Sequence, residues 1–425
     1  MGGMFGVISK EDCLDDLFYG TDYHSHLGTQ FGGLAVIHHD HGFVKSIHDI
    51  RTTQFRTKLE ADLAEFRPAQ SGIGVISDFD AQPRTIESHL GLYSITTVGV
   101  IGNSEELKQA AFKGRSAHFT DRTPEGITPT ELLATLINQG DSFEEGLKLA
   151  QQSIQGSCSV LLLTKQGIYA ARDKLGRTPL IIGEKQGSFA IASETCALPN
   201  LGYNVTNCLG PGEIVLMTPE GIEQKKEPDS KMQVCSFLWV YYGFPASSYE
   251  GINVETVRYE CGKALARRDM KEGFSVEGLD FVAGIPDSGT AHAIGYAMES
   301  GRPYARPFVK YTPTWPRSFM PQDQRVRELV AKMKLLPIRE LIEGKSLLFC
   351  EDSIVRGTQL QDTITLLHHY GAREIHMRPA CPPLNYGCEF LNFSRSKSVM
   401  ALATRKSLRD LLGKEQFTQE ELRRC

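Results

Sequence analysis

The chain has 425 residues, of which 41% are hydrophobic and 23% charged, so it can bury sizeable cores and is not globally disordered. At roughly 150 residues per domain, this length predicts two to three domains. The 46 basic and 51 acidic side chains give a net charge of −5, which offers no overall attraction to nucleic acid or to an anionic membrane. No apolar run reaches the roughly 20 residues that cross a bilayer, and no secretory-signal pattern is present, so we expect a cytoplasmic protein.

Short apolar runs separated by turn residues dominate the first half of the chain. Residues 72–76, 93–101 and 159–164 are runs of this kind, often β-branched and bounded by Gly, Pro or Asn, which is typical of strands. Helical patterns at residues 130–138 and 143–154 interrupt them. This half is therefore predicted to hold two sheets with helices packed on them.

The second half alternates strands and helices. Residues 279–285 and 346–350 read as buried strands, each followed by a helix, at 291–300 and 361–370, and residues 374–378 form a further strand. Such succession predicts right-handed βαβ units and a parallel sheet. Ligands of parallel sheets bind beyond the carboxyl ends of the strands, so the loops after the first two strands are candidate sites.

The loop after the second of these strands carries the most specific motif. The strand runs into Glu351 and Asp352, and a short loop containing Ser353 and Gly357 leads to a helix at Thr358. Backbone N–H groups at the start of a helix form an anion site, and glycine lets the main chain approach a phosphate closely. Hydroxyls can donate to the same phosphate, and the carboxylates can accept from ribose hydroxyls. The alternative is an exposed acidic strand end followed by a capped helix.

Residues 346–360 resemble the signature of type I phosphoribosyltransferases, which bind 5-phosphoribosyl-1-pyrophosphate (PRPP), and more narrowly that of amidophosphoribosyltransferases of purine synthesis. The resemblance covers most of the chain. Further matches follow in the family's order: Ala171-Arg172-Asp173, Ser193-Glu194-Thr195, Pro211-Gly212-Glu213-Ile214, Pro286-Asp287-Ser288-Gly289 and Ala380-Cys381-Pro382-Pro383.

The resemblance implies an α+β N-terminal-nucleophile domain, similar to class II glutamine amidotransferases, followed by an α/β type I phosphoribosyltransferase domain with a parallel sheet. We expect residues 1–232 to form the first domain, with a degenerate glutaminase site. Residues 233–405 would form the second, and residues 406–425 a C-terminal helical tail.

The resemblance also implies a PRPP site. Mg²⁺ would bind with the substrate near Ser288, Glu351 and Asp352, mostly through diphosphate oxygens and water. The expected PRPP-binding residues are Glu351, Asp352, Ser353, Ile354, Val355, Arg356, Gly357, Thr358, Asp287, Ser288, Gly289, Lys310, Arg317 and Lys334.

The first half departs from the family pattern at the site that would cleave glutamine. Gly2 stands where the family has its nucleophilic Cys, and glycine cannot form an acyl-enzyme. Ser77 replaces an Arg that binds the glutamine carboxylate, and Pro129 replaces an Asp that holds its amine. The family's Asn-Gly oxyanion pair corresponds to Ile101-Gly102, and losing one such donor usually costs about 10²–10³ in rate. We therefore expect no catalytic residue at Gly2 and no glutaminase activity.

The second half departs less. Glu351 replaces an Asp and keeps the carboxylate one methylene further out. The loop after Lys310 contains Pro313 and Pro316, which stiffen a loop that moves in the family. The sequence therefore supports PRPP binding better than catalysis by loop closure.

An iron–sulfur cluster is a further implication of the resemblance. Some amidophosphoribosyltransferases hold a 4Fe–4S cluster with four Cys, and Cys235 and Cys388 match two of these positions. Two thiols cannot complete the site, so the cluster requires a C-terminal Cys pair beyond this chain. The alternative is that both are buried structural thiols.

These residues leave the function open between two classes. An enzyme would form phosphoribosylamine from PRPP with ammonia from solution or a partner. A regulatory paralogue would bind PRPP or a purine nucleotide without turnover. A transferase that uses a different amine or nucleobase is a weaker third possibility. In each case the expected partners are PRPP and purine nucleotides, with neither nucleic acid nor membrane, in a homo-oligomer (dimer or tetramer).

Overall fold

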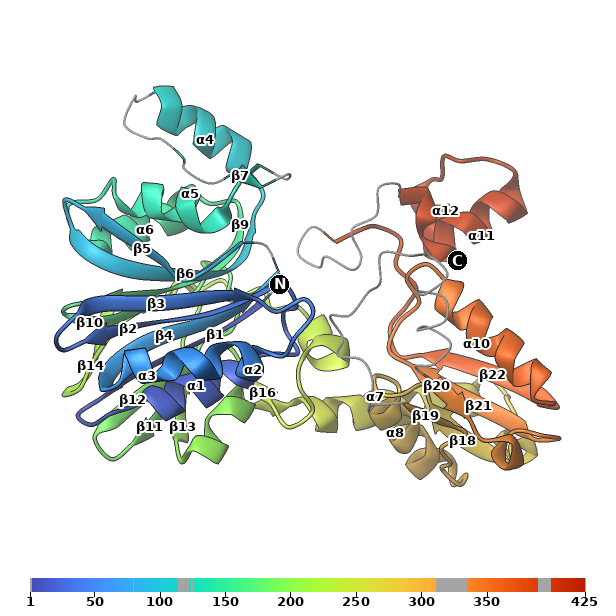
Figure 1. Cartoon of the computed structure of the whole chain (residues 1–425). Coiled ribbons are helices and arrows are strands. Elements are labelled where there is room, and N and C mark those ends of the chain that lie inside the picture. Colours follow the sequence, from blue (N-terminus) through green and yellow to red (C-terminus); the bar gives the residue numbers. More distant parts are fainter. Residues whose placement is uncertain are drawn as a thin grey trace. The chain divides into compact units, whose positions relative to one another are not determined.

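A computed structural model describes residues 2–78, 80–113, 119, 122–123, 126–310, 335–388 and 399–424 (Figure 1). These residues form two compact units. The first contains Met1–Cys235 and Ala246–Gly251, and the second contains Ser236–Pro245 and the described residues from Ile252 onward. In the described ranges no helix combines the length and apolar character needed to cross a membrane.

Two antiparallel sheets form the framework of the first unit. The seven-stranded sheet runs in the order β13 (Asn204–Cys208), β11 (Ile181–Lys185), β12 (Ser188–Ala192), β1 (Gly2–Ser9), β4 (Ala69–Ser77), β2 (Phe31–His38) and β3 (Gly42–Asp49). The six-stranded sheet runs in the order β15 (Gly221–Lys226), β14 (Ile214–Thr218), β10 (Gly167–Ala171), β9 (Gly156–Thr164), β6 (Gly91–Ile101) and β5 (Arg84–Ser88).

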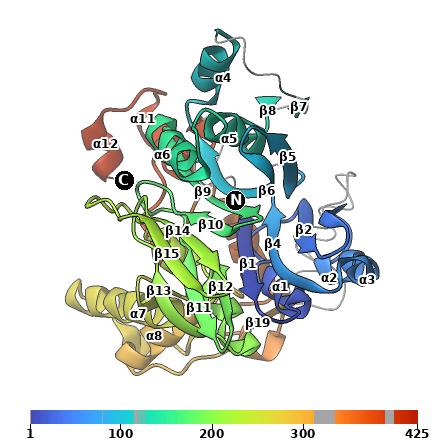
Figure 2. The same cartoon turned by 90° about the vertical axis from the view of Figure 1, so that its left-hand side faces the viewer.

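Side-chain alternation along the strands builds a layered core. Met4 and Ile8 of β1 pack between the two sheets, with Val98 of β6, whereas Phe5 and Val7 point to the other face. Both faces of β1 are therefore buried, and the strand reads as one apolar run. The outer face of the first sheet is covered by α1 (Leu14–Asp22), α2 (Phe55–Leu59) and α3 (Leu63–Phe66). The outer face of the second is covered by α5 (Pro129–Ile137) and α6 (Phe143–Ser153) (Figures 1 and 2).

Local signals explain where the predicted helices begin. The Thr128 hydroxyl accepts from the N–H of Glu131, and Pro129 occupies the first turn of α5, where a missing N–H costs nothing. Ser142 caps α6 in the same way. The prediction of two sheets covered by helices is confirmed, with these two helices within one residue of their expected bounds.

A parallel sheet forms the core of the second unit, in the order β18 (Phe281–Gly284), β21 (Ser346–Glu351) and β22 (Glu374–Pro379). Along β21, Leu348 and Cys350 pack toward α7 (Val254–Lys271) and α8 (Thr290–Ser300). Leu347 and Phe349 pack on the opposite face, with α10 (Thr358–His369). The predicted parallel sheet with interleaved helices is confirmed.

The C-terminal part of the chain contains two helices. These are α11 (Ala403–Leu412) and α12 (Gln419–Arg424), and Gly413, with φ +65°, ends the first of them. Both helices belong to the second unit, because the buried Leu402 and Leu408 anchor them and the N–H of Ala403 donates to the Val355 carbonyl at 2.9 Å.

Shorter elements complete the two units. The remaining helix and strands are α4 (Ser104–Lys113), β7 (Arg122–Thr123), β8 (Gly126–Ile127), β16 (Ser248–Tyr249), β17 (Ile252–Asn253), β19 (Phe308–Lys310) and β20 (Leu335–Pro337). The 3₁₀ helices are η1 (Glu60–Asp62), η2 (Thr195–Ala197), η3 (Pro199–Leu201), η5 (Val276–Gly278), η6 (Arg339–Leu341) and η8 (Val399–Ala401), and η4 (Leu238–Tyr242) is a π-helix.

Candidate active site

The loop between β21 and α10 has the geometry of an anion site. The strand ends at Glu351, and the helix begins at Thr358 after Gly357. Gly357 has φ +76°, a conformation that costs a residue with a Cβ about 1–2 kcal/mol. The N–H groups of the first helical turn have no partner within the helix. The loop therefore presents main-chain donors together with the Ser353 and Thr358 hydroxyls.

Two carboxyl groups meet at the end of β21. The Ser288 hydroxyl donates to Glu351 Oε1 at 2.8 Å, and the Asp352 N–H donates to the same oxygen at 3.1 Å. The Ser353 hydroxyl donates to Asp352 Oδ2 at 2.6 Å, and Asp352 is buried. Burial, followed by the neighbouring Asp352, raises the pKa of Glu351 far above its ordinary value. At neutral pH Glu351 is therefore expected to be protonated.

A second loop, between β18 and α8, packs closely against the end of β21. A Cβ on Gly289 would lie 2.1 Å from the Cys350 carbonyl oxygen, so only glycine fits there. This close approach brings Ser288 within hydrogen-bonding distance of Glu351. In the same loop, Asp287 accepts from Lys310 Nζ at 2.6 Å, and both side chains are exposed.

The structure thus brings together most of the expected PRPP-binding residues. The backbones of Ile354 and Val355 link the loop to neighbouring segments, because their carbonyls accept hydrogen bonds from the N–H groups of Leu384 and Ala403. Arg356 is exposed in the loop. Arg317 and Lys334 lie outside the described residues.

A small pocket surrounds Gly2 in the first unit. It is lined by Gly2, Ser77, Asp80, Gln82, Thr97, Val98, Gly99 and Pro129. A Cβ on Gly2 would lie 2.4 Å from the Ile76 carbonyl oxygen, so the backbone leaves no room for a side chain there. Ser77 and Pro129, which the resemblance assigns to a degenerate glutamine site, line this pocket with Gly2.

Ile101 and Gly102 do not line this pocket. Ile101 packs in the core beneath α5 and α6, and the Gly102 N–H already donates to the Gln155 carbonyl at 2.7 Å. Gly102 therefore has no spare donor, contrary to our expectation. Val98 and Gly99, three residues earlier in β6, occupy the corresponding place.

Asp80, Gln82 and Thr97 also line the pocket, although no sequence motif singled them out. The packing of one sheet on the other brings Gly99 of β6 to the wall beside Gly2. A Cβ on Gly99 would lie 1.8 Å from the Ser157 carbonyl oxygen, which explains why this position is glycine.

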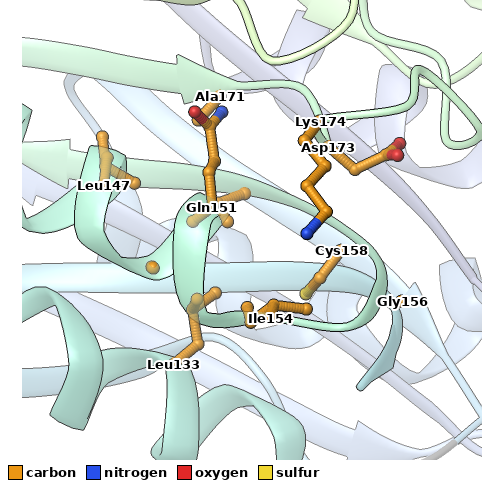
Figure 3. A pocket seen from close by; sticks show the side chains of 11 residues that line it. Leu133, Leu147, Gln151, Ile154, Gly156, Cys158, Ala171, Asp173 and Lys174 are labelled. Atoms are coloured by element: carbon orange, nitrogen blue, oxygen red, sulfur yellow. The ribbon is translucent and has the colours of Figure 1, made fainter. Parts of the chain in front are cut away.

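Neither Cys158 nor Cys13 substitutes for the missing nucleophile. Cys158 points into a second cavity, between the six-stranded sheet and α5 and α6, where the Lys174 and Gln151 side chains also lie (Figure 3). Burial, followed by the Asp173 and Asp80 charges, raises the pKa of Cys158. Burial likewise raises the pKa of Cys13. Both thiols are therefore protonated and poor nucleophiles at neutral pH.

The described residues do not fit an iron–sulfur cluster. Cys235 belongs to the first unit and is exposed, and Cys388 belongs to the second and is half-buried. Across the described ranges no three His, Cys, Asp or Glu side chains are grouped to hold a metal ion. The exposure of Cys235 also contradicts the alternative that both are buried structural thiols.

Comparisons with known proteins support the assignment of both units. A glutamine amidotransferase domain matches residues 71–200. The amidophosphoribosyltransferase of Mycobacterium tuberculosis is 30% identical over 94% of this chain and 76% of its own length. That of Archaeoglobus fulgidus is 33% identical over 76% of this chain and 69% of its own length.

Solved structures give the same result. The glutamine PRPP amidotransferase from B. subtilis, complexed with ADP and GMP, matches with a TM-score of 0.83 at 26% identity, over 99% of this chain and 91% of that one. A structure described as the allosteric regulatory enzyme of purine biosynthesis matches with a TM-score of 0.84, also at 26% identity, over 99% of this chain and 90% of that one.

Fold and comparisons together define a class II glutamine amidotransferase-like domain followed by a type I phosphoribosyltransferase domain, as the sequence predicted. The chain belongs to the amidophosphoribosyltransferase family, pentosyltransferases of purine biosynthesis.

Proposed function

We propose that the protein forms 5-phosphoribosylamine from PRPP and free ammonia, and that it does not hydrolyse glutamine. One contrast carries the proposal. The loop from Asp352 to Thr358 keeps its anion-binding backbone, whereas Gly2 has no side chain and the Ile76 carbonyl fills the space that a side chain would need.

The loop residues have distinct proposed roles in binding PRPP. The N–H groups at the start of α10, with the Ser353 and Thr358 hydroxyls, hold the 5-phosphate. Asp352 and Glu351 accept from the ribose hydroxyls. The loop containing Asp287, Ser288 and Gly289 holds the diphosphate, together with Lys310 and with Arg317 and Lys334.

Magnesium fits this arrangement as an ion bound mainly by the substrate. Ser288, Glu351 and Asp352 offer protein oxygens, and Mg²⁺ typically takes one or two carboxylates plus phosphate oxygens and water. When bound, the ion neutralises charge on the leaving diphosphate.

Ammonia then attacks C1 of the ribose, the C–N bond forms as the C–O bond to diphosphate breaks, and the new amine loses a proton to solvent. The protein contributes positioning and electrostatics. The carboxyl oxygens of Glu351 and Asp352 would face the ribose, where positive charge develops.

Pyrophosphate release tests the proposal. With PRPP and Mg²⁺, we expect release on adding ammonium and none on adding glutamine. Asp352→Asn removes a charged acceptor and should weaken PRPP binding at least about 10-fold. Asp362→Asn, an exposed position on α10, is the matched control and should bind normally. Release with glutamine alone, or unchanged affinity of Asp352→Asn, would refute the proposal.

The alternative is a regulatory protein that binds PRPP or purine nucleotides without turnover. Two contacts favour it: Lys310 is paired with Asp287, and Ser288 is bound to Glu351, so groups assigned to the diphosphate already have partners. PRPP binding without pyrophosphate release under any amine would establish this alternative. A homo-oligomer of two or four chains stays a prediction for either function.

A further inference from the structure

The described wall of the pocket around Gly2 is anionic. Among the described residues that line it, Asp80 is the single ionisable side chain, and none is Lys, Arg or His. The second cavity, in Figure 3, differs in this respect because Lys174 lies in its lining and most of its wall is apolar. Of these two cavities, only the one around Gly2 presents an acceptor-rich, anionic wall.

Asp80 is fixed in place by a neighbouring amide. The Gln82 Nε2 group donates to Asp80 Oδ1 at 2.6 Å and to the Thr97 carbonyl at 3.2 Å, and Gln82 Oε1 accepts from the Thr97 N–H at 2.7 Å. Gln82 is thus fully engaged and cannot turn away. The Asp80 carboxyl therefore keeps a single orientation.

The other oxygen of Asp80 accepts from no donor among the described residues. The side chain is 3% exposed, and within the described part of the chain Oδ2 is buried without a hydrogen-bond partner. A buried charged acceptor left unpaired costs more than about 1–3 kcal/mol, so a donor that also carries positive charge would be strongly favoured at this atom. Ser77 and Thr97 add hydroxyl oxygens to the same wall.

The free volume fixes the size of the ligand. About 10 Å³ is open, which is room for one water-sized group. A free amino acid such as glutamine is far too large. Water would satisfy the hydrogen bond but leave the charge uncompensated, whereas an ammonium ion is of similar size, is positively charged and donates through N–H groups.

We propose that this pocket binds one ammonium ion through Asp80 Oδ2. The inference goes beyond the proposed reaction, because binding here requires neither PRPP nor turnover in the second unit. The two proposals can therefore fail separately.

Thermal unfolding in the absence of PRPP tests the site. Ammonium chloride, compared with sodium and potassium chloride at equal ionic strength, should raise the Tm in a saturable way, since a ligand that binds only the folded state stabilises it. Asp80→Asn should weaken the apparent affinity about 10-fold or more. Asp40→Asn, which removes an exposed carboxylate elsewhere in the unit, should respond like the wild type. An equal response to potassium, or an unchanged response in Asp80→Asn, would overturn the proposal.

A second measurement covers the case in which Asp80→Asn does not fold. Wild-type crystals soaked in thallous acetate, whose cation mimics ammonium, should show an anomalous peak within hydrogen-bonding distance of Asp80 Oδ2. Absence of the peak at that atom would overturn the proposal.

Discussion

Position 2 shows at the scale of one residue why the first unit lacks a nucleophile. The Ile76 carbonyl oxygen lies 2.4 Å from where a Cβ would be, and this neighbour is backbone within the paired strands β1 and β4. A side chain at position 2 would therefore require this backbone to shift.

Restoring the thiol should consequently fail to restore glutaminase activity. We expect Gly2→Cys to release no glutamate from glutamine above the wild-type background and to lower the free energy of unfolding by about 1–3 kcal/mol, because the added atom overpacks the sheet. Glutamate release and urea unfolding measure these effects.

Gly221→Cys is the matched control, since a Cβ there meets no atom within 4 Å. It should leave stability nearly unchanged. Glutamine hydrolysis by Gly2→Cys would show that the pocket retains its catalytic machinery.

His24 gives the first unit a pH-dependent stability. The side chain is fully buried, and its Nδ1 lies 2.8 Å from the Gly20 carbonyl. Burial lowers the pKa of His24 to about 4, although the Glu194 charge partly opposes this. As pH falls from about 6.5 to 4, His24 becomes protonated in the unfolded chain but stays neutral in the folded chain. The folded state therefore loses stability over this pH range.

His24→Asn keeps an amide donor toward Gly20 but removes the titration. We expect the stability lost between about pH 6.5 and 4 to shrink by on the order of 3 kcal/mol in this variant. Urea unfolding followed by circular dichroism across that range measures it. His39→Asn, at an exposed histidine, should leave the loss unchanged, and an equal loss in His24→Asn would contradict the assignment.

At the scale of an element, the loop before α10 depends on one backbone conformation. Gly357→Ala places a Cβ on a residue with φ +76°, and this Cβ would lie in ordinary van der Waals contact with Ala403, at 3.5 Å. Backbone strain rather than steric crowding would therefore lower the stability. We expect a loss of about 1–2 kcal/mol in stability and a weaker affinity for PRPP, measured by urea unfolding and by calorimetry.

Gly344→Ala separates these two effects. Gly344 has φ +70° in the same unit, with nothing near its missing Cβ, but lies before β21 and away from the loop. It should lose similar stability and bind PRPP normally. Equal loss of affinity in both variants would mean that the loop of Gly357 has no special part in binding.

Strand and helix patterns predicted the elements well because burial sets their periodicity. Residues 347–350 are apolar at every position because Leu347 and Leu348 face different cores, and β21 contains this run. The acid pair and Gly357 were found from sequence because the motif is contiguous.

The pocket around Gly2 was only partly predictable because residues of both sheets line it. Gly99 and Gly102 are equivalent candidates in the sequence, and only the packing of the two sheets shows that Gly99 lines the pocket. Asp80 and Gln82 carry no motif, so their mutual hydrogen bond appears only in three dimensions.

At the scale of the whole molecule, the two units have diverged from the family pattern to different degrees. In the phosphoribosyl unit, the loop before α8 contacts the end of β21, since the Ser288 hydroxyl donates to Glu351. In the amidotransferase unit, the two sheets enclose an apolar core, and the pocket at Gly2 is small and anionic. Stability of the first fold does not depend on a nucleophile at position 2, because the layers are held by apolar strands.

A nitrogen-competition experiment tests most directly whether the phosphoribosyl unit works without the amidotransferase unit. The protein would receive PRPP, Mg²⁺, glutamine labelled with heavy nitrogen in its amide, and unlabelled ammonium, and mass spectrometry would follow the nitrogen of the phosphoribosylamine formed. We predict product with unlabelled nitrogen only and no glutamate. Heavy nitrogen in the product would contradict this account.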